Sequence, residues 1–259
     1  MRTTLSEALL KTAETWAAAV LEASHECPPV NVERIAELLG VTTVSRVSML
    51  QDGRLEKRND CVRILLRKDV PPTRQRFTLC HELGHLLLEP PKDRWVAQRS
   101  RATSSNTEER FCDAFAAALL LPRSWVREKM ARRGSRGELS MALEIANEAD
   151  ASLSAVVRRL SDVSGCRQSL LHWRKVDGRW GLCSTFVYQR SLRGRVNGAP
   201  ESSAILDLLA EANRHVAGRA FPLEVRDSRV AVPAELFFRS PRSASMLVDL
   251  SNIADVGVA

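Results

Sequence analysis

The sequence lacks any long hydrophobic run. Its longest apolar stretch, Ala114 to Leu121, is far shorter than the roughly 20 residues that a helix needs to cross a bilayer. The N-terminus carries charges at Glu7, Lys11 and Glu14 where a secretory signal would have a continuous apolar segment. We therefore expect a cytoplasmic protein that does not contact a membrane.

None of the six cysteines belongs to a Cys-x-x-Cys pair. The chain thus lacks the local spacing of a cysteine-ligated zinc site, and we expect its thiols to be reduced. Aromatic residues make up only 5% of the 259 residues, but the 44% of apolar residues can fill one large core or two smaller ones. The net charge of +7 favours contact with an acidic partner, although solubility is the simpler explanation.

Hydrophobic periodicity, interrupted by proline and glycine, predicts a mainly helical first half with a few strands. Two or three further helices follow, up to about residue 161. In the first 122 residues we expect helices over 6–22, 32–39, 73–88 and 107–121, strands over 41–50 and 61–67, and a polar loop over 94–106.

The pattern changes after Ser164-Gly165, where strands become more frequent. Strands over 170–176 and 179–187 flank Asp177-Gly178, a strong signal for a β-hairpin. A helix over 202–216 and short strands over 221–225 and 229–232 follow. We predict an α+β fold with three parts: a mainly helical domain with a small sheet at 1–122, a helical region resembling a helix-turn-helix at 123–164, and a small α+β domain at 165–259.

A His-Glu-x-x-His motif spans residues 81–85. Four residues advance a helix by about 400°, so His81 and His85 share one face and can bind one tetrahedral ion. Zinc lowers the pKa of a bound water from about 15.7 to about 7, and Glu82 is placed to take its proton as general base. An ordinary core helix with two hydrogen-bonded histidines is the alternative, but the motif and its helical context favour a Zn²⁺ site.

A hydrolytic zinc site needs a third protein ligand and one open position, and we assign the third ligand to Glu109 on the following helix. Asp113 lies one turn later on the same face and can accept a hydrogen bond from a ligating histidine. The alternative is that Glu108 and Glu109 only complement the helix dipole. The spacing of the two carboxylates favours the ligand role for Glu109. The neighbouring Cys80 and Cys112 are interpreted as buried packing residues.

On these motifs the sequence resembles the ImmA/IrrE family of metallopeptidases over roughly residues 29–160. The resemblance is carried by VNVERIA at 30–36, by RQRFTLCHELGH at 74–85, and by the helix from Glu109 that ends in Leu-x-Pro at Pro122. It implies a zincin-like peptidase domain. Thermolysin-like zincins similarly place a glutamate ligand four residues before a supporting aspartate, as Glu109 and Asp113 are placed here.

The resemblance also implies a substrate, because family members typically cleave a helix-turn-helix transcriptional repressor of the XRE type in a stress response or a mobile element. A repressor segment would lie along the cleft and pair with an exposed strand, for which we expect residues 61–67 as the edge strand. Some relatives carry a GAF-like sensory domain after the peptidase, and residues 165–259 have a compatible mix of strands and a helix.

Residues 138–160 read as two helices joined by a turn, with Arg158 and Arg159 as candidate phosphate contacts. A helical subdomain without DNA contact is the favoured interpretation, because most helix pairs do not bind DNA. Two other functions compete with the peptidase: a DNA-binding or ligand-sensing regulator whose metal site is not catalytic, and a component of a toxin–antitoxin or phage system. Glu82 argues for the peptidase, since a structural metal site has no use for a base.

Overall fold

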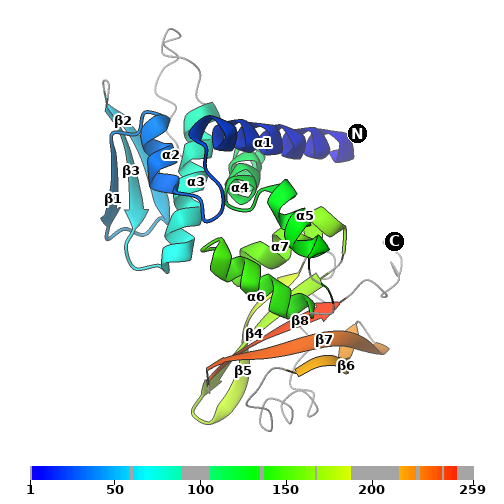
Figure 1. Cartoon of the computed structure of the whole chain (residues 1–259). Coiled ribbons are helices and arrows are strands. Elements are labelled where there is room, and N and C mark those ends of the chain that lie inside the picture. The colour runs from blue at the N-terminus through cyan, green and yellow to red at the C-terminus, as the bar shows by residue number, and fades with distance from the viewer. Residues whose placement is uncertain are drawn as a thin grey trace. The chain divides into compact units, whose positions relative to one another are not determined.

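The computed structural model divides the chain into two compact units (Figure 1). The first comprises residues 1–126 and 146–152, and the second comprises residues 127–145 and 153–259. Helices and two sheets together confirm the predicted α+β class. The structure describes residues 2–58, 61–88, 106–132, 134, 137–166, 168–187, 216–225, 228–240 and 242–249.

Among the residues that the structure describes, four helices lie in the first unit, and they occupy the segments predicted for them. The side chain of Asn31 caps the second helix by accepting a hydrogen bond from the backbone N–H of Arg34 at 3.1 Å. Glu108 and Glu109 lie in the first turn of the fourth helix, where negative charge is favourable. The helices are α1 (Arg2–Ser24), α2 (Val32–Leu38), α3 (Pro72–Leu88) and α4 (Asn106–Leu120).

The sheet of the first unit has the strand order β1-β3-β2, with β1 (Thr43–Val47) parallel and β2 (Gly53–Arg58) antiparallel to β3 (Cys61–Arg67). The expectation that residues 61–67 form an edge strand is therefore wrong. Ile64 and Leu66 of β3 are fully buried, so this most apolar strand takes the centre of the sheet. β1 and β2 form the edges.

The central position of β3 depends on β2, which the sequence analysis did not identify. Its segment from Gly53 to Arg58 contains a single apolar side chain, Leu55, among charged residues. Leu55 is buried, whereas the charged residues on either side of it are half-buried or exposed. Backbone pairing with β3 and the burial of one leucine are thus sufficient to form a strand that hydrophobic periodicity does not reveal.

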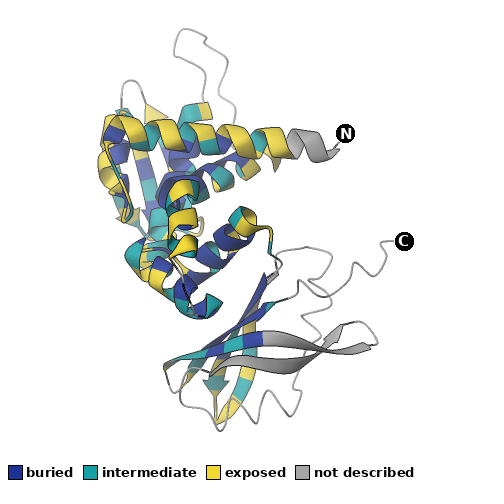
Figure 2. Cartoon of the chain, turned by 45° about the vertical axis from the view of Figure 1, so that its right-hand side comes forward, coloured by how far each residue is buried: buried dark blue, intermediate teal, exposed yellow. Residues whose placement is uncertain are grey.

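The core of the first unit lies where α1 and α3 pack against α4. The rings of Phe111 and Phe115 stack with centroids 6.3 Å apart, and Trp16 meets Phe111 edge to face at 5.2 Å. Leu79 and Leu83 of α3 are also buried, and they lie one turn apart on the same face of that helix. The exposed residues of α1 lie on the side away from this core (Figure 2).

The second unit combines three helices with a five-stranded antiparallel sheet of order β5-β4-β8-β7-β6. The predicted helix-turn-helix pattern at 138–160 corresponds to two helices of nearly the expected bounds. The elements are α5 (Arg123–Ala131), α6 (Glu138–Glu148), α7 (Leu153–Ser164), β4 (Gln168–Val176), β5 (Arg179–Val187), β6 (Val216–Val225), β7 (Ser228–Ser240) and β8 (Ser243–Asp249). Helices α5 and α6 each cross from one unit into the other.

The predicted hairpin forms at Asp177-Gly178, which joins β4 to β5. Both residues have positive φ angles, 49° and 79°, as a type I′ turn requires. The strands predicted at 221–225 and 229–232 are parts of β6 and β7, whereas β8 was not predicted. The helix expected at 202–216 lies outside the described residues apart from Val216, which begins β6, and so does the loop at 94–105.

Arg159 is buried in α7, so its assignment as a phosphate contact is wrong, whereas Arg158 is exposed. The amphipathic α7 buries Val156, Val157 and Leu160, and Arg159 falls on that same face. The domain boundaries after residues 122 and 164 stay predictions. Within the described part of the chain, no helix combines the length and the apolar character required to span a bilayer.

The aromatic cluster on α4 gives a prediction for stability. Replacing Phe115 with alanine removes a fully buried ring, and we expect the free energy of unfolding to fall by about 3–5 kcal/mol. Leu38→Ala is the control, because the leucine is 61% exposed and its loss is expected to cost no more than about 0.5 kcal/mol. Urea unfolding followed by circular dichroism measures both, and equal losses in the two variants would contradict this core assignment.

Candidate metal centre

Helix α3 presents the motif at residues 81–85. Pro72 occupies its first position, where the missing N–H of proline costs no helical hydrogen bond. Leu79 and Leu83 anchor one face in the core and leave His81 and His85 half-buried on another. The two rings lie edge to face with centroids 4.9 Å apart, and their Nε2 atoms are 3.1 Å apart. The one-turn spacing therefore brings the two imidazoles together, as expected.

Helix α4 places Glu109 beside the two histidines. One carboxylate oxygen lies 3.2 Å from Nε2 of His81, and the other lies 3.3 Å from Nε2 of His85. Ligand atoms bound at about 2.0–2.1 Å to a tetrahedral ion are about 3.3–3.4 Å from one another. The three separations of 3.1, 3.2 and 3.3 Å are close to that spacing, so the donor set fits a small tetrahedral cation.

Asp113 stands behind His81, one turn after Glu109. Its Oδ1 lies 2.9 Å from Nδ1 of His81, a distance at which the ring N–H donates to the carboxylate. That hydrogen bond fixes the tautomer and turns the lone pair of Nε2 toward His85 and Glu109.

The pKa of His81 reflects the negative charge around it. Burial lowers this pKa, but the hydrogen bond to Asp113 and the charges of Asp113, Glu82 and Glu109 outweigh burial and raise it above its ordinary value. A cluster of carboxylates around two imidazoles is therefore a site at which positive charge is stabilised.

Cys112 provides a second candidate for a third ligand, because its Sγ and the ring nitrogens of His81 and His85 lie within 4.8 Å of one another. Burial, followed by the charges of Glu109 and Glu82, raises the pKa of this thiol far above its ordinary value. A metal-binding thiol must be deprotonated. The carboxylate oxygens of Glu109 lie only 3.2 and 3.3 Å from the Nε2 atoms of His81 and His85, so the geometry favours Glu109.

Cys112 has a clear packing role. A Cβ added to Gly84 of α3 would lie 3.0 Å from its Cα and 3.2 Å from its Sγ. Glycine at this position thus allows α3 and α4 to approach closely, and α4 carries Glu109 with it. Burial also raises the pKa of the fully buried Cys80 to about 12, which keeps this thiol protonated.

Glu82 lies between the two histidines in sequence and is only 8% exposed. It packs against β2: a Cβ on Gly53 would collide with the methyl group of Thr78 and lie 2.8 Å from Oε1 of Glu82. The first residue of β2 therefore borders the carboxylate. Neither Gly53 nor Gly84 was predicted from the sequence, because a glycine that permits close packing has no distinguishing pattern in a single sequence.

Comparisons with known proteins identify a family likeness over this part of the chain. Residues 36–161 match the family model described as the IrrE N-terminal-like domain, a peptidase family. Over 102 residues, or 38% of this chain, the sequence is 33% identical to the radiation response metalloprotease IrrE of Deinococcus deserti and 32% identical to that of Deinococcus radiodurans. The matched segments cover 36% and 30% of those relatives, so most of each relative has no counterpart in the match.

A solved structure described as a Mycobacterium tuberculosis transcriptional regulator is similar in fold. It aligns with a TM-score of 0.56 over 93% of this chain and 76% of that chain, at 15% sequence identity. At that identity the likeness concerns the fold alone.

The contact between Gly53 and α3 can be tested by adding a single methyl group. We expect Gly53→Ala to lower the free energy of unfolding by roughly 1–3 kcal/mol, because the rigid side chain of Thr78 cannot move away from the new Cβ. Gly181→Ala in β5 is the matched control, since no atom of the described residues lies within 4 Å of a Cβ there. Denaturant titration measures the free energy of unfolding of both variants. An unchanged free energy for Gly53→Ala would show that β2 does not pack closely against α3.

Proposed function

Because residues 36–161 belong to the IrrE N-terminal-like family of metallopeptidases, we propose that this protein is a zinc-dependent endopeptidase. Its metal ligands are His81, His85 and Glu109, and its general base is Glu82. The convergence of two Nε2 atoms and one carboxylate at 3.1–3.3 Å carries this proposal. It also supports a zincin-like architecture for residues 1–122.

Zinc is the metal that suits these ligands. Two imidazoles and one carboxylate with an open fourth position form the ligand set of catalytic zinc sites, whereas calcium and magnesium prefer all-oxygen sites with more ligands. Asp113 contributes by holding Nδ1 of His81 at 2.9 Å, which keeps Nε2 available as a ligand. Loss of that hydrogen bond weakens metal binding without removing a ligand.

Peptide hydrolysis needs a proton acceptor beside the attacking water. Bound zinc supplies a Lewis acid and makes water more acidic. Glu82, mostly buried and on the same helix turn as the histidines, accepts the proton and later donates it to the leaving amine. Its Oε1 borders Gly53 of β2, so the close approach of that strand limits the space open to the carboxylate.

The proposed substrate is a helix-turn-helix repressor of the XRE type, cleaved to relieve repression in a stress response or a mobile element. The family resemblance over the motif supports this choice, and the relatives are described as radiation response metalloproteases. A cytoplasmic location and a sensory, GAF-like role for residues 165–259 belong to the same proposal, with a helical region at 123–164 between the two domains.

A DNA-binding regulator with a non-catalytic metal site is the second candidate. Exposed Arg158 on α7 and the net charge of +7 favour it, whereas the burial of Arg159 leaves that helix with less cationic surface than expected. A gel-shift titration at two salt concentrations separates the two functions, because phosphate contacts make DNA affinity strongly salt-dependent. A component of a toxin–antitoxin or phage system is compatible with either activity.

The role of Glu82 is tested by Glu82→Gln. We expect the variant to bind zinc as the unmodified protein does but to cleave the repressor at least roughly 10²-fold more slowly, since the amide cannot accept the proton. Intact-mass spectrometry of the repressor measures cleavage, and atomic absorption measures zinc. Glu37→Gln, the same change at an exposed residue of α2, is the control and should cleave normally. Normal cleavage by Glu82→Gln would refute the mechanism.

The identity of the third ligand is tested by comparing Glu109→Gln with Cys112→Ala. We expect Glu109→Gln to weaken zinc affinity by roughly 10²-fold or more, and Cys112→Ala to leave it within about threefold, because Glu109 completes the tetrahedral set. Competition with a chelating dye measures both affinities. The opposite order would assign the position to the cysteine.

A further inference from the structure

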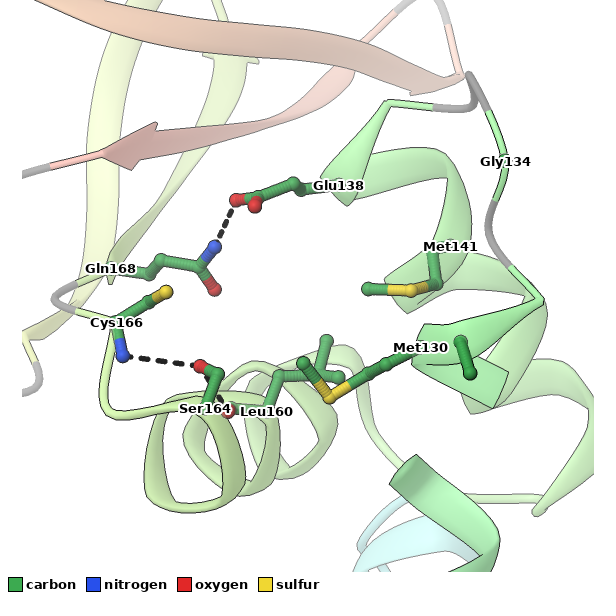
Figure 3. Close-up of a pocket in the computed structure, with 9 residues that line it drawn as sticks. Met130, Gly134, Glu138, Met141, Leu160, Ser164, Cys166 and Gln168 are labelled. Carbon is green, nitrogen blue, oxygen red and sulfur yellow. Dashed lines mark hydrogen bonds between the residues drawn. The ribbon is translucent and has the colours of Figure 1, made fainter. Parts of the chain in front are cut away.

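The second unit contains a cavity that shares no residue with the metal centre. Its volume is 380 Å³, within the range of about 300–1,000 Å³ typical of small-molecule sites. It lies between the helices α5, α6 and α7 and the beginning of β4 (Figure 3). Met130, Met141 and Leu160 form its apolar wall, and Glu138 and Gln168 form its polar side.

Gln168 points an unsatisfied acceptor into this cavity. The residue is only 4% exposed, and its Nε2 donates a hydrogen bond to the carboxylate of Glu138. Because a carboxylate can only accept, this contact fixes the orientation of the amide and leaves Oε1 on the other side. Among the described residues Oε1 has no hydrogen-bond partner, and it faces the space in front of Met141 and Leu160 (Figure 3). Buried polar atoms without a partner are uncommon.

The remaining polar groups of the cavity restrict what can bind. The hydroxyl of Ser164 donates to the carbonyl of Leu160 at 2.8 Å and accepts from the N–H of Cys166 at 3.1 Å, so its proton is already used. Thioether sulfurs are weak acceptors, and Glu138 adds negative charge. The lining thus offers acceptors and an apolar surface, which suits a hydrogen-bond donor and disfavours an anion.

The polar side of the cavity is held in place by the sheet. Glu235 of β7 accepts hydrogen bonds from the backbone N–H groups of Glu138 and Leu139, at 2.6 and 3.0 Å, and so caps the N-terminus of α6. A Cβ on Gly137 would collide with this carboxylate, so glycine leaves room for the cap. Two strands, β4 through Gln168 and β7 through Glu235, therefore fix the start of α6, and the acceptor is preorganised.

We propose that this cavity is a binding site for a small, neutral or cationic organic molecule whose N–H group donates to Oε1 of Gln168 and whose apolar part contacts Met130 and Met141. The ligand therefore contacts residues of α5, α6 and β4 at the same time. The site is independent of metal binding and of peptidase activity, because none of its residues contributes to either.

The proposal can be tested on the full chain with benzylamine as the probe and phenylacetate as its anionic counterpart. The five methionines, labelled with ¹³C in their methyl groups, report on binding in NMR spectra. We expect saturable shifts of the Met130 and Met141 signals with benzylamine and at least roughly tenfold weaker binding of phenylacetate, which Glu138 repels and Oε1 cannot bind. Equal binding of the two probes, or no shift of either signal, would overturn the proposal.

Two variants locate the site. Gln168→Leu should weaken benzylamine binding by roughly tenfold, the effect of losing one hydrogen bond to a charged donor. Ala131→Phe fills the cavity from its exposed edge and should abolish binding, whereas Ala18→Phe on the exposed face of α1 should not. The signal of Met246, buried in β8, shows whether each variant remains folded. If Gln168→Leu does not fold, the result for Ala131→Phe decides whether benzylamine binds in this cavity. Unchanged benzylamine affinity in a folded variant of either kind would refute this location.

Discussion

The close packing of α3 on α4 is the contact on which the metal centre depends. The two histidines come from a single helix turn, but Glu109 and Asp113 reach them only because the neighbouring helix lies nearly against the backbone of α3. Gly84 makes this possible, since a Cβ at its position would be 3.0 Å from Cα of Cys112. A site that needs atoms within about 3.4 Å of one another tolerates little separation of the two helices.

At the metal centre, repulsion between the carboxylates opposes the close packing of α3 and α4, whereas the apolar core favours it. Glu82, Glu109 and Asp113 surround His81, and like charges held together at a partly buried site repel one another. The aromatic core of Trp16, Phe111 and Phe115 supplies the apolar contact that keeps α4 in place despite that repulsion. A bound cation would offset the repulsion and stabilise the folded state by linkage, so that metal binding and the stability of the first unit are coupled.

The second unit follows a different principle, in which side chains of the sheet fix the helices. Glu235 caps α6 and Gln168 contacts Glu138, so the first residues of that helix are positioned by β7 and β4. The contacts of Glu235 join residues 96 and 97 positions apart, and the contact of Gln168 with Glu138 joins residues 30 positions apart. They form the polar side of a cavity that is chemically unlike the metal centre: its described lining has one buried acceptor without a partner, together with two thioethers, and contains no histidine.

The sequence by itself determined the features that rest on local spacing. These are the helix with two imidazoles one turn apart, the carboxylates of Glu109 and Asp113 on one helix face, and the hairpin at Asp177-Gly178. Only the tertiary structure decided the features that rest on pairing between distant segments. It placed residues 61–67 at the centre of the sheet, formed β2 from a charged segment and buried Arg159. It also directed the side chain of Gln168 toward the interior of a cavity. Periodicity records which face of an element is apolar, but not which partner covers that face.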